Sequence, residues 1–265
     1  MKNIESNRNA HIIEAKLILH HVGEKNKEKQ FKLADVLSEI SYPDVPTEIE
    51  WKQGNPEKLI LETCSIAKID LLILGALQHE NKFQFYVGSI ARKLTRNVCC
   101  SVLLLIKPSA NRVPCRHVVV NGLNDPGTPF AIEQAFYVSS ALGAQQITIV
   151  EEILPKEIHV TVEDDRTLKK ANIIKERIAL REDSRIKSII SKIPEKFTVN
   201  QKVKTQSIFG KRGYSIGHYA EVVRADLLVM NAPKKTGLWD RIFPHDIEYI
   251  LSDLPTDLLI IRQQN

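Results

Sequence analysis

The sequence has no long apolar run and no apolar leader. No stretch comes near the about 20 consecutive apolar residues that a membrane-spanning helix requires, and the longest runs, such as Ser101–Ile106, have the length of a β-strand. The first nine residues, MKNIESNRN, lack the apolar core of a signal peptide. We therefore expect a soluble, cytoplasmic protein that does not insert directly into a membrane.

Cysteine is scarce, and its spacing does not suit a metal site. The chain has four cysteines and no Cys-x-x-Cys pair. Cys99 and Cys100 are neighbours, which cannot easily bridge each other, so we expect reduced thiols. Adding His20 and His21 does not produce the ligand spacing of a zinc site. We predict no metal site built from the protein's own side chains.

Positive charge is neither concentrated in one block nor interleaved with aromatic residues. The net charge is +5, yet the lysines and arginines are scattered, and only 6% of the residues are aromatic. Pairs such as Lys169-Lys170 are typical of solvated helix faces. A groove that binds nucleic acid would need basic and aromatic residues together. We therefore predict no nucleic-acid partner.

An internal duplication is the most informative feature of the sequence. The segment Asp70–Leu74, DLLIL, reappears as Asp226–Met230, DLLVM, at an offset of 156 residues. The segment Val102–Leu105 reappears as Leu258–Ile261 at the same offset of 156. Because two apolar strands and the helix between them keep this register without a gap, we predict two tandem domains.

Both halves of the chain predict strands that alternate with helices. In the first half we expect strands at Lys16–Val22, Thr47–Lys52, Asp70–Leu74 and Ser101–Ile106, and helices at Lys29–Ile40, Pro56–Ile69 and Ser89–Arg96. In the second half we expect strands at His117–Val120, Gln146–Val150, Phe197–Val203, Asp226–Met230 and Asp257–Ile261. The helices there should run from Thr128, as N-cap, to Gly143, and over Asp165–Ile193, Ser215–Arg224 and Asp246–Ser252. The first of these helices has a predicted buried stripe of Ala131, Ala135, Val138 and Leu142.

Near-continuous apolar strands indicate parallel sheets that are covered on both faces. The predicted fold is therefore α/β, with two tandem doubly wound, Rossmann-like domains of five strands each in the order 3-2-1-4-5. We place the domains at residues 1–110 and 111–265, with a linker at Lys107–Cys115.

The first domain is short at its front. The second domain uses about 30 residues from Arg116 to its second strand at Gln146, whereas only 15 residues precede Lys16. These 15 can supply most of a first helix but no first strand, which would be central in the sheet. Its absence would leave buried backbone groups unpaired. Either the strands close up, another chain or segment fills the gap, or the natural N-terminus lies upstream.

A glycine motif follows the strand at Asp70–Leu74. Gly75, then Gln78 in place of a second glycine, and then Gly88-Ser89 fit three of the four positions of the pattern G-x2-G-x9-G-[ST]. Glycine lets a backbone approach phosphate closely, and a helix that begins after Gly-Ser offers free N–H groups and its dipole to an anion. The equivalent positions of the second domain do not fit: Asn231, Lys234, Pro244 and His245.

This motif, together with LILHHV at 17–22 and the helix entry Gly54-Asn55-Pro56, resembles the universal stress protein family over nearly the whole chain, twice. The resemblance implies the doubly wound fold, a tendency to dimerise, and either an ATP-binding or a non-binding class. If the chain is of the binding class, the resemblance implies that the first domain binds ATP or AMP, with Mg²⁺, through Gly75, Gln78, Gly88 and Ser89; if it is not, Gly75, Gly88 and Ser89 only turn the chain and begin a helix. The family's acidic residue on the adenine side follows the first strand, where the second domain has Asn121, so neither domain keeps a complete site.

Three functions stay open. The first is a non-catalytic stress-response or regulatory protein that binds adenine nucleotide weakly, since no nucleophile–base pattern or carboxylate pair indicates an enzyme beyond slow ATP hydrolysis. The second is a cytosolic regulatory domain related to the tails of cation/proton antiporters or amino-acid permeases, which the turn Asn124–Gly127 resembles. The third is an interaction module without nucleotide.

The interaction module would use an apolar loop as a partner-docking surface. Its residues are Leu238, Trp239, Ile242 and Phe243, and their counterparts in the first domain are Phe83, Phe85 and Tyr86. We also expect the two domains to associate as an intramolecular pseudo-dimer, with a homodimer as a further form and a protein or a transporter as the partner.

Overall fold

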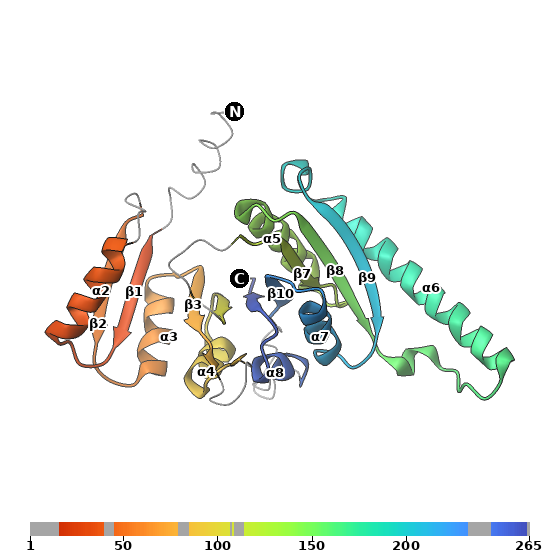
Figure 1. Cartoon of the computed structure of the whole chain (residues 1–265), viewed down its shortest axis with the longest axis horizontal. Helices are drawn as coiled ribbons and strands as arrows, with labels where there is room; N and C mark the ends of the chain where they lie inside the picture. The colour runs from red at the N-terminus through yellow and green to blue at the C-terminus, as the bar shows by residue number, and fades with distance from the viewer. Residues whose placement is uncertain are drawn as a thin grey trace. The chain divides into compact units, whose positions relative to one another are not determined.

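The computed structural model describes residues 16–39, 45–78, 85–106, 108, 114–232 and 245–263. The chain divides into two compact units, Met1–Ile69 with Ser109–Arg112, and Asp70–Pro108 with Val113–Asn265. Figure 1 labels many of the elements of both units, and each unit is described by itself. The units do not follow the predicted domains, because the end of the first domain joins the sheet of the second. The domain division at residues 110 and 111 stays a prediction.

The smaller unit contains a two-stranded parallel sheet and two helices. Strands β1 (Leu17–Val22) and β2 (Thr47–Lys52) pair along their whole length. Helix α2 spans Lys27–Glu39 and helix α3 spans Pro56–Ile66. The predicted strands and helices are all found here, with ends that differ by at most a few residues.

The start of α3 follows from its local sequence. The side chain of Asn55 accepts a hydrogen bond from the N–H of Lys58 at 3.1 Å, which satisfies one of the free donors of the first turn. Pro56 occupies the first turn, where its missing N–H has no intrahelical partner in any case. Gly54 precedes them at φ +140°, a conformation that other residues rarely adopt.

The larger unit is built on one seven-stranded sheet, in the order β3-β6-β11-β10-β7-β8-β9. Its strands are β3 (Leu71–Gly75), β6 (Ser101–Leu105), β7 (His117–Asn121), β8 (Gln146–Ile153), β9 (Lys202–Phe209), β10 (Leu227–Asn231) and β11 (Asp257–Ile261). Neighbours are parallel, except that β6 and β11 are antiparallel. The predicted α/β architecture with parallel strands is therefore confirmed.

This sheet contains all five strands of the second domain and the last two long strands of the first domain. The second domain contributes β11-β10-β7-β8-β9, which places its first strand, β7, in the centre. The first domain contributes β3 and β6, whereas β1 and β2 form a sheet of their own. Within the residues that the structure describes, no strand precedes β1.

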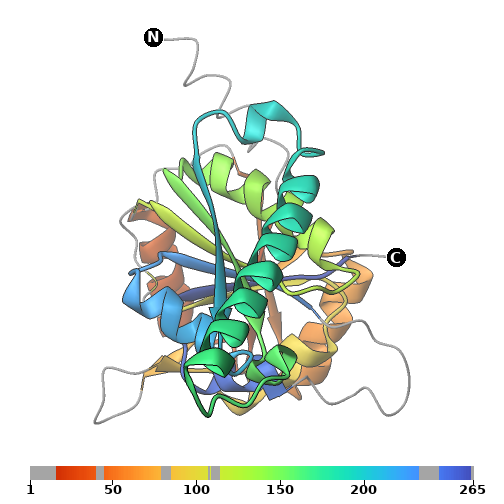
Figure 2. The same ribbon diagram turned by 90° about the vertical axis from the view of Figure 1, so that its right-hand side faces the viewer.

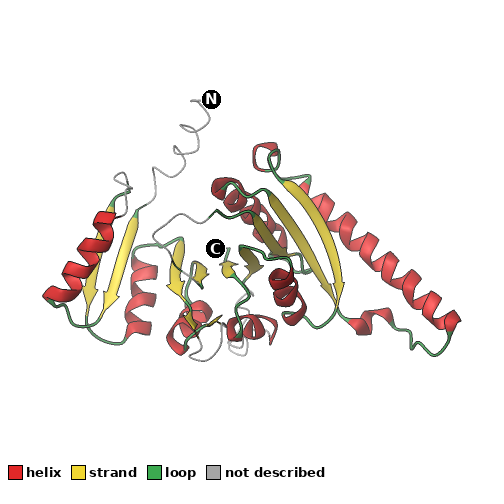
Figure 3. Cartoon of the chain, viewed as in Figure 1, coloured by secondary structure: helices red, strands yellow, loops and turns green. Residues whose placement is uncertain are grey.

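Helices alternate with the strands along the chain, as Figure 3 shows. The helices of the larger unit are α4 (Ser89–Asn97), α5 (Thr128–Leu142), α6 (Asp165–Ile190), α7 (Tyr214–Val222) and α8 (His245–Ser252). The long helix α6, green to teal in Figure 2, packs along β9 and against α5.

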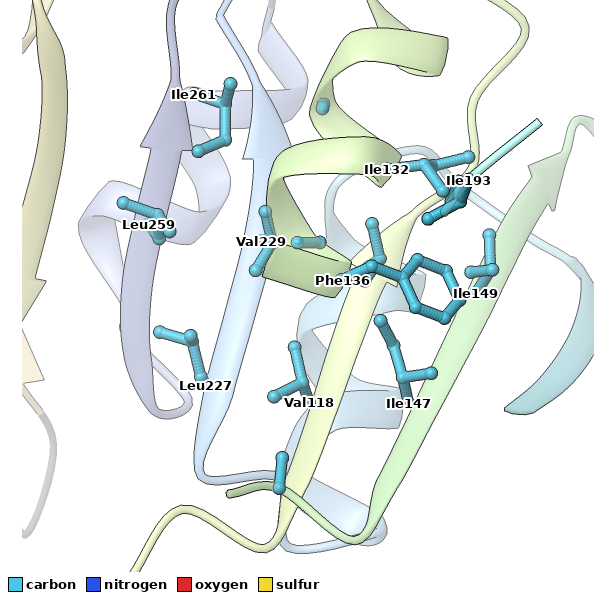
Figure 4. Close-up of a cluster of buried hydrophobic side chains, with 14 of the residues drawn as sticks. Val118, Ile132, Phe136, Ile147, Ile149, Ile193, Leu227, Val229, Leu259 and Ile261 are labelled. Atoms are coloured by element: carbon cyan, nitrogen blue, oxygen red, sulfur yellow. The ribbon is translucent and has the colours of Figure 1, made fainter. Parts of the chain in front are cut away.

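The main core lies between the sheet and the pair α5 and α6 (Figure 4). Alternate residues of the strands, such as Val118, Ile147 and Val229, point to this face and are at most 1% exposed. Phe136 of α5 and Ile186 of α6 pack on them from the helix side. Intervening strand residues such as Val119 and Leu228 are also buried, so both faces of the sheet carry apolar side chains, as the continuous apolar strands predicted.

Three local predictions were wrong. The strand expected at Phe197–Val203 is a 3-10 turn at Glu195–Phe197 followed by β9, because Phe197 packs edge-on against Tyr137 of α5. Thr128 is not the N-cap of α5: Gly127 is, and the Thr128 hydroxyl donates to the carbonyl of Leu123. Leu142, which belongs to the predicted buried stripe of α5, is 44% exposed.

Candidate functional site

The glycine motif of the first domain connects β3 to α4. Gly75 is the last residue of β3, and the N–H of the next residue, Ala76, donates to the carbonyl of Leu105 at 2.8 Å. Gln78 lies in a short strand, β4 (Leu77–Gln78), which pairs antiparallel with β5 (Phe85–Tyr86). No pattern in the sequence predicts this hairpin. It places Gln78, which is exposed, between the two glycines of the motif.

The second half of the motif forms the start of α4. Gly88 is the N-cap, and Ser89 is the first helical residue. The first bond of the helix runs from the N–H of Arg92 to the carbonyl of Gly88 at 2.8 Å, so the N–H groups of residues 89–91 precede the helical ladder. Space is close on one side, since a Cβ on Gly88 would lie 2.9 Å from Cδ1 of Leu77. The structure therefore brings all four predicted positions into one loop and one helix start.

The same loop is attached to the second domain. The N–H of Val87 donates to the carbonyl of Leu251 at 2.9 Å, and the N–H of Leu254 donates to the carbonyl of Phe85 at 2.8 Å. Phe85 is buried. The predicted docking residues Leu238, Trp239, Ile242 and Phe243 lie outside the described residues, as does Phe83.

In the second domain, a side chain occupies the position of the first glycine. Asn231 ends β10, and its amide donates to Oδ1 of Asp125 at 2.7 Å. The same Asp125 oxygen accepts from the N–H of Gly127 at 2.8 Å. A Cβ on Gly127 would lie 2.5 Å from the Asn231 side chain. Asn231 thus fills the space between the end of β10 and the turn after β7.

Of the remaining positions, Lys234 and Pro244 lie outside the described residues, and His245 is the first residue of α8. Asn121, which stands near the family's acidic position, uses its side-chain oxygen to accept from the N–H of Leu123 at 3.0 Å. The side chains of Asn121, Asp125 and Asn231 are therefore engaged with one another or with the chain's own backbone.

A family model described as "Universal stress protein family" matches residues 9–105. Residues 9–105 belong to the universal stress protein family. That span contains β1, β2, β3, β6 and the complete glycine motif. A search of the curated proteins finds no match for the chain.

Solved universal stress proteins share the fold of almost the whole chain. A putative universal stress protein from Pseudomonas aeruginosa is 13% identical, with a TM-score of 0.63 over 97% of this chain and 86% of its own length. A Pseudomonas aeruginosa protein described as functionally unknown is 13% identical, with a TM-score of 0.64 over 98% of this chain and 86% of its own length. A universal stress protein from Archaeoglobus fulgidus is 14% identical, with a TM-score of 0.53 over 93% of this chain and 86% of its own length.

Strand β8 of the second domain carries two buried carboxylates that no sequence motif indicated. Glu152 of β8 is 1% exposed and accepts hydrogen bonds from the N–H groups of Gly213, at 3.0 Å, and Ile216, at 2.8 Å. It therefore satisfies free donors at the start of α7 from inside the protein. Its neighbour Glu151 is 5% exposed and points to the other face of the sheet, toward α6.

Glu151 is held by an arginine of α6. Arg185 donates to Glu151 at 2.5 Å and to Glu182 at 2.7 Å, and it also contacts the carbonyl of Gly122. Burial raises the pKa of Glu151 to about 7, although the Arg185 charge opposes that rise. Hydrogen bonds from Arg185 and Arg181 hold the pKa of Glu182 below its usual value in spite of burial. The network ties α6 to the turn after β7.

The smaller unit contains a cluster of polar side chains from β1, β2 and α3. His20 lies 2.9 Å from Glu50, and Lys52 lies 3.1 Å from Glu50 and donates to Thr63 at 2.8 Å. The hydrogen bond from His20, and next that from Lys52, lower the pKa of Glu50.

No three His, Cys, Asp or Glu side chains gather as a metal site in the described part of the chain. Over the same residues, no helix is long and apolar enough to cross a bilayer.

Proposed function

We propose that the chain is a non-catalytic regulatory member of the universal stress protein family whose first repeat binds the phosphate end of an adenine nucleotide weakly. One observation carries the proposal: α4 begins at Gly88 with three N–H groups ahead of its hydrogen-bond ladder, next to the Gly75 loop. A helix start of this kind favours an anion through both its donors and its dipole. In the second repeat, Asn231 fills the matching space.

Binding should be weak because the adenine side is incomplete. The strand that carries the family's acidic residue does not occur among the described residues of the first repeat. Phosphate contacts alone contribute charge-assisted hydrogen bonds but little selectivity for the base. We therefore expect similar affinities for ATP and other nucleoside triphosphates, and lower affinity for AMP, which carries fewer phosphate charges.

The side chains at the loop also favour binding over chemistry. Gln78 and Ser89 carry no group that titrates near neutral pH, so neither is a general base for a water molecule. Hydrolysis should be slow or undetectable on this ground.

Titration calorimetry with ATP and Mg²⁺ tests the proposal. The wild type should bind with a dissociation constant of about 0.1–1 mM, because only a few charge-assisted hydrogen bonds contribute to the binding free energy. Gly88→Val should abolish the heat, because its side chain would cover the start of α4. Valine adopts the φ of −62° without backbone strain, and its Cβ, 2.9 Å from Cδ1 of Leu77, requires that flexible side-chain end to shift. Gly217→Ala is the matched control, since its methyl would meet Ile250 at an ordinary 3.8 Å.

Two results would count against the proposal. The first is no heat from the wild type at millimolar ATP with Mg²⁺. The second is equal binding by the wild type and Gly88→Val, which would place any nucleotide elsewhere on the protein.

A further inference from the structure

The antiparallel pair β6–β11 has the symmetry of a dimer interface, although both strands belong to one chain. Leu103 pairs with Leu259, Val102 with Ile260 and Leu104 with Leu258. Leu103 and Leu259 are equivalent positions of the two repeats, 156 residues apart. At the centre of the pairing, a residue of one repeat therefore pairs with the equivalent residue of the other repeat. This is the arrangement found at the two-fold axis of an isologous interface.

Hydrogen bonds beside the strands obey the same symmetry. The N–H of Ile106 donates to Oδ1 of Asp257 at 2.8 Å, and the N–H of Arg262 donates to Oγ of Ser101 at 3.1 Å. At the offset of 156, Asp257 is the counterpart of Ser101, and Arg262 is the counterpart of Ile106. Each contact is therefore the symmetry copy of the other, made with a different side chain.

The charged residues between α4 and α8 follow the symmetry in position but not in sign. Arg92 and Glu248 are counterparts, 156 residues apart, and they face each other, with Nη1 of Arg92 2.5 Å from the carboxylate. Arg96 also donates to Glu248, through Nε at 2.9 Å. The counterpart of Arg96 is Ser252, whose hydroxyl lies 3.4 Å from Nη2 of Arg92.

We propose that Arg92, Arg96 and Glu248 decide which edges pair: the α4–β6 edge of the first repeat accepts the α8–β11 edge of the second repeat and rejects a copy of itself. Pairing of two first-repeat edges would bring four arginines together without a carboxylate. Pairing of two second-repeat edges would place Glu248 against Glu248. The side chains of Arg92, Arg96 and Glu248 are 25%, 35% and 22% exposed, so water screens such repulsion only in part.

The occupant of the edge is therefore the other repeat of the same chain, and charge, not shape, makes the choice. The apolar strands cannot choose by themselves, because Val102–Leu104 and Leu258–Ile260 have nearly the same side chains. Selection among similar apolar edges by like-charge contacts is a general means of specificity.

Two variants of the full-length chain test this. Glu248→Arg makes both edges positive, and Arg92→Glu with Arg96→Glu makes both edges negative. Each variant alone should lose pairing between its own repeats, with at least a tenfold drop in the equilibrium constant for folding measured by urea unfolding. When the two are mixed, each positive edge finds a negative edge in the other chain. Size-exclusion chromatography with light scattering should then show a one-to-one heterodimer.

Two controls keep structural damage separate from charge. The triple variant with all three substitutions reverses the signs and should recover most of the wild-type stability as a single chain. Glu248→Gln, which keeps the shape, should fall between the wild type and Glu248→Arg. The proposal is overturned if the mixture forms no heterodimer, or if the triple variant is as unstable as Glu248→Arg alone.

Discussion

Replacing the buried carboxylate of Glu152 should be among the most damaging single changes in the second repeat. Glu152 is 1% exposed and accepts from the N–H groups of both Gly213 and Ile216 at the start of α7. A hydrogen bond to a charged group contributes about 1.5–3 kcal/mol, and a buried donor left without a partner costs about 1–3 kcal/mol. Glu152→Gln keeps one acceptor oxygen but turns an NH₂ group toward the second N–H. We therefore expect a loss of about 3 kcal/mol in the free energy of unfolding.

Urea unfolding followed by circular dichroism measures this loss. Because the slope for a domain of this size is about 1–3 kcal/mol per M, the midpoint should fall by about 1 M or more. Glu176→Gln, at an exposed position of α6, is the matched control and should stay within about 0.5 kcal/mol of the wild type. The reasoning fails if Glu152→Gln is no more destabilising than Glu176→Gln, because the two hydrogen bonds would then contribute nothing.

The other predictions concern pH and backbone conformation. Burial raises the pKa of Glu151 from 4.5 to about 7, so between these pH values the folded state binds a proton that the unfolded state has lost. The stability that this group contributes therefore falls as the pH rises from 4.5 to 7. Glu151→Gln should flatten that part of the pH profile of thermal unfolding, and an unchanged slope would contradict the assignment. Gly143 ends α5 at φ +72° with open space around it, so Gly143→Ala should cost about 1 kcal/mol through the backbone alone. Gly75→Ala, also in open space but without a positive φ, should be nearly neutral, and equal costs would refute the explanation.

Much of the fold could be predicted because apolar runs are bounded by strong local signals. The strands Thr47–Lys52 and Asp257–Ile261 occur as predicted, each a short run between turn residues. Gly143 ends α5 in the left-handed conformation that a helix end favours. The motif begins at the end of β3 and finishes at the start of α4, as the spacing of its glycines predicted. In these cases the nearest neighbours in sequence determine the structure.

The predictions that failed depend on contacts between distant residues. Strand β8 continues through Glu151 and Glu152, which looked like the end of a strand, because both carboxylates have partners on other elements. The hairpin of β4 and β5 has two residues per strand, too few for a periodic pattern. The contact of Asn231 with Asp125 likewise requires the folded sheet, so the sequence alone showed only a lost glycine.

The pairing of β6 with β11 also sets an order of events during synthesis. At about 5–20 residues per second, Leu259 is added roughly 8 to 30 s after its partner Leu103. During that interval the edge of β6 at Val102–Leu104 has no strand beside it on that side, and an uncovered apolar edge is a site for wrong pairing between nascent chains. On a polysome, neighbouring chains present this edge to one another. The arginines of α4 stand beside it from the moment the first repeat is made, and they oppose that encounter before the second repeat exists.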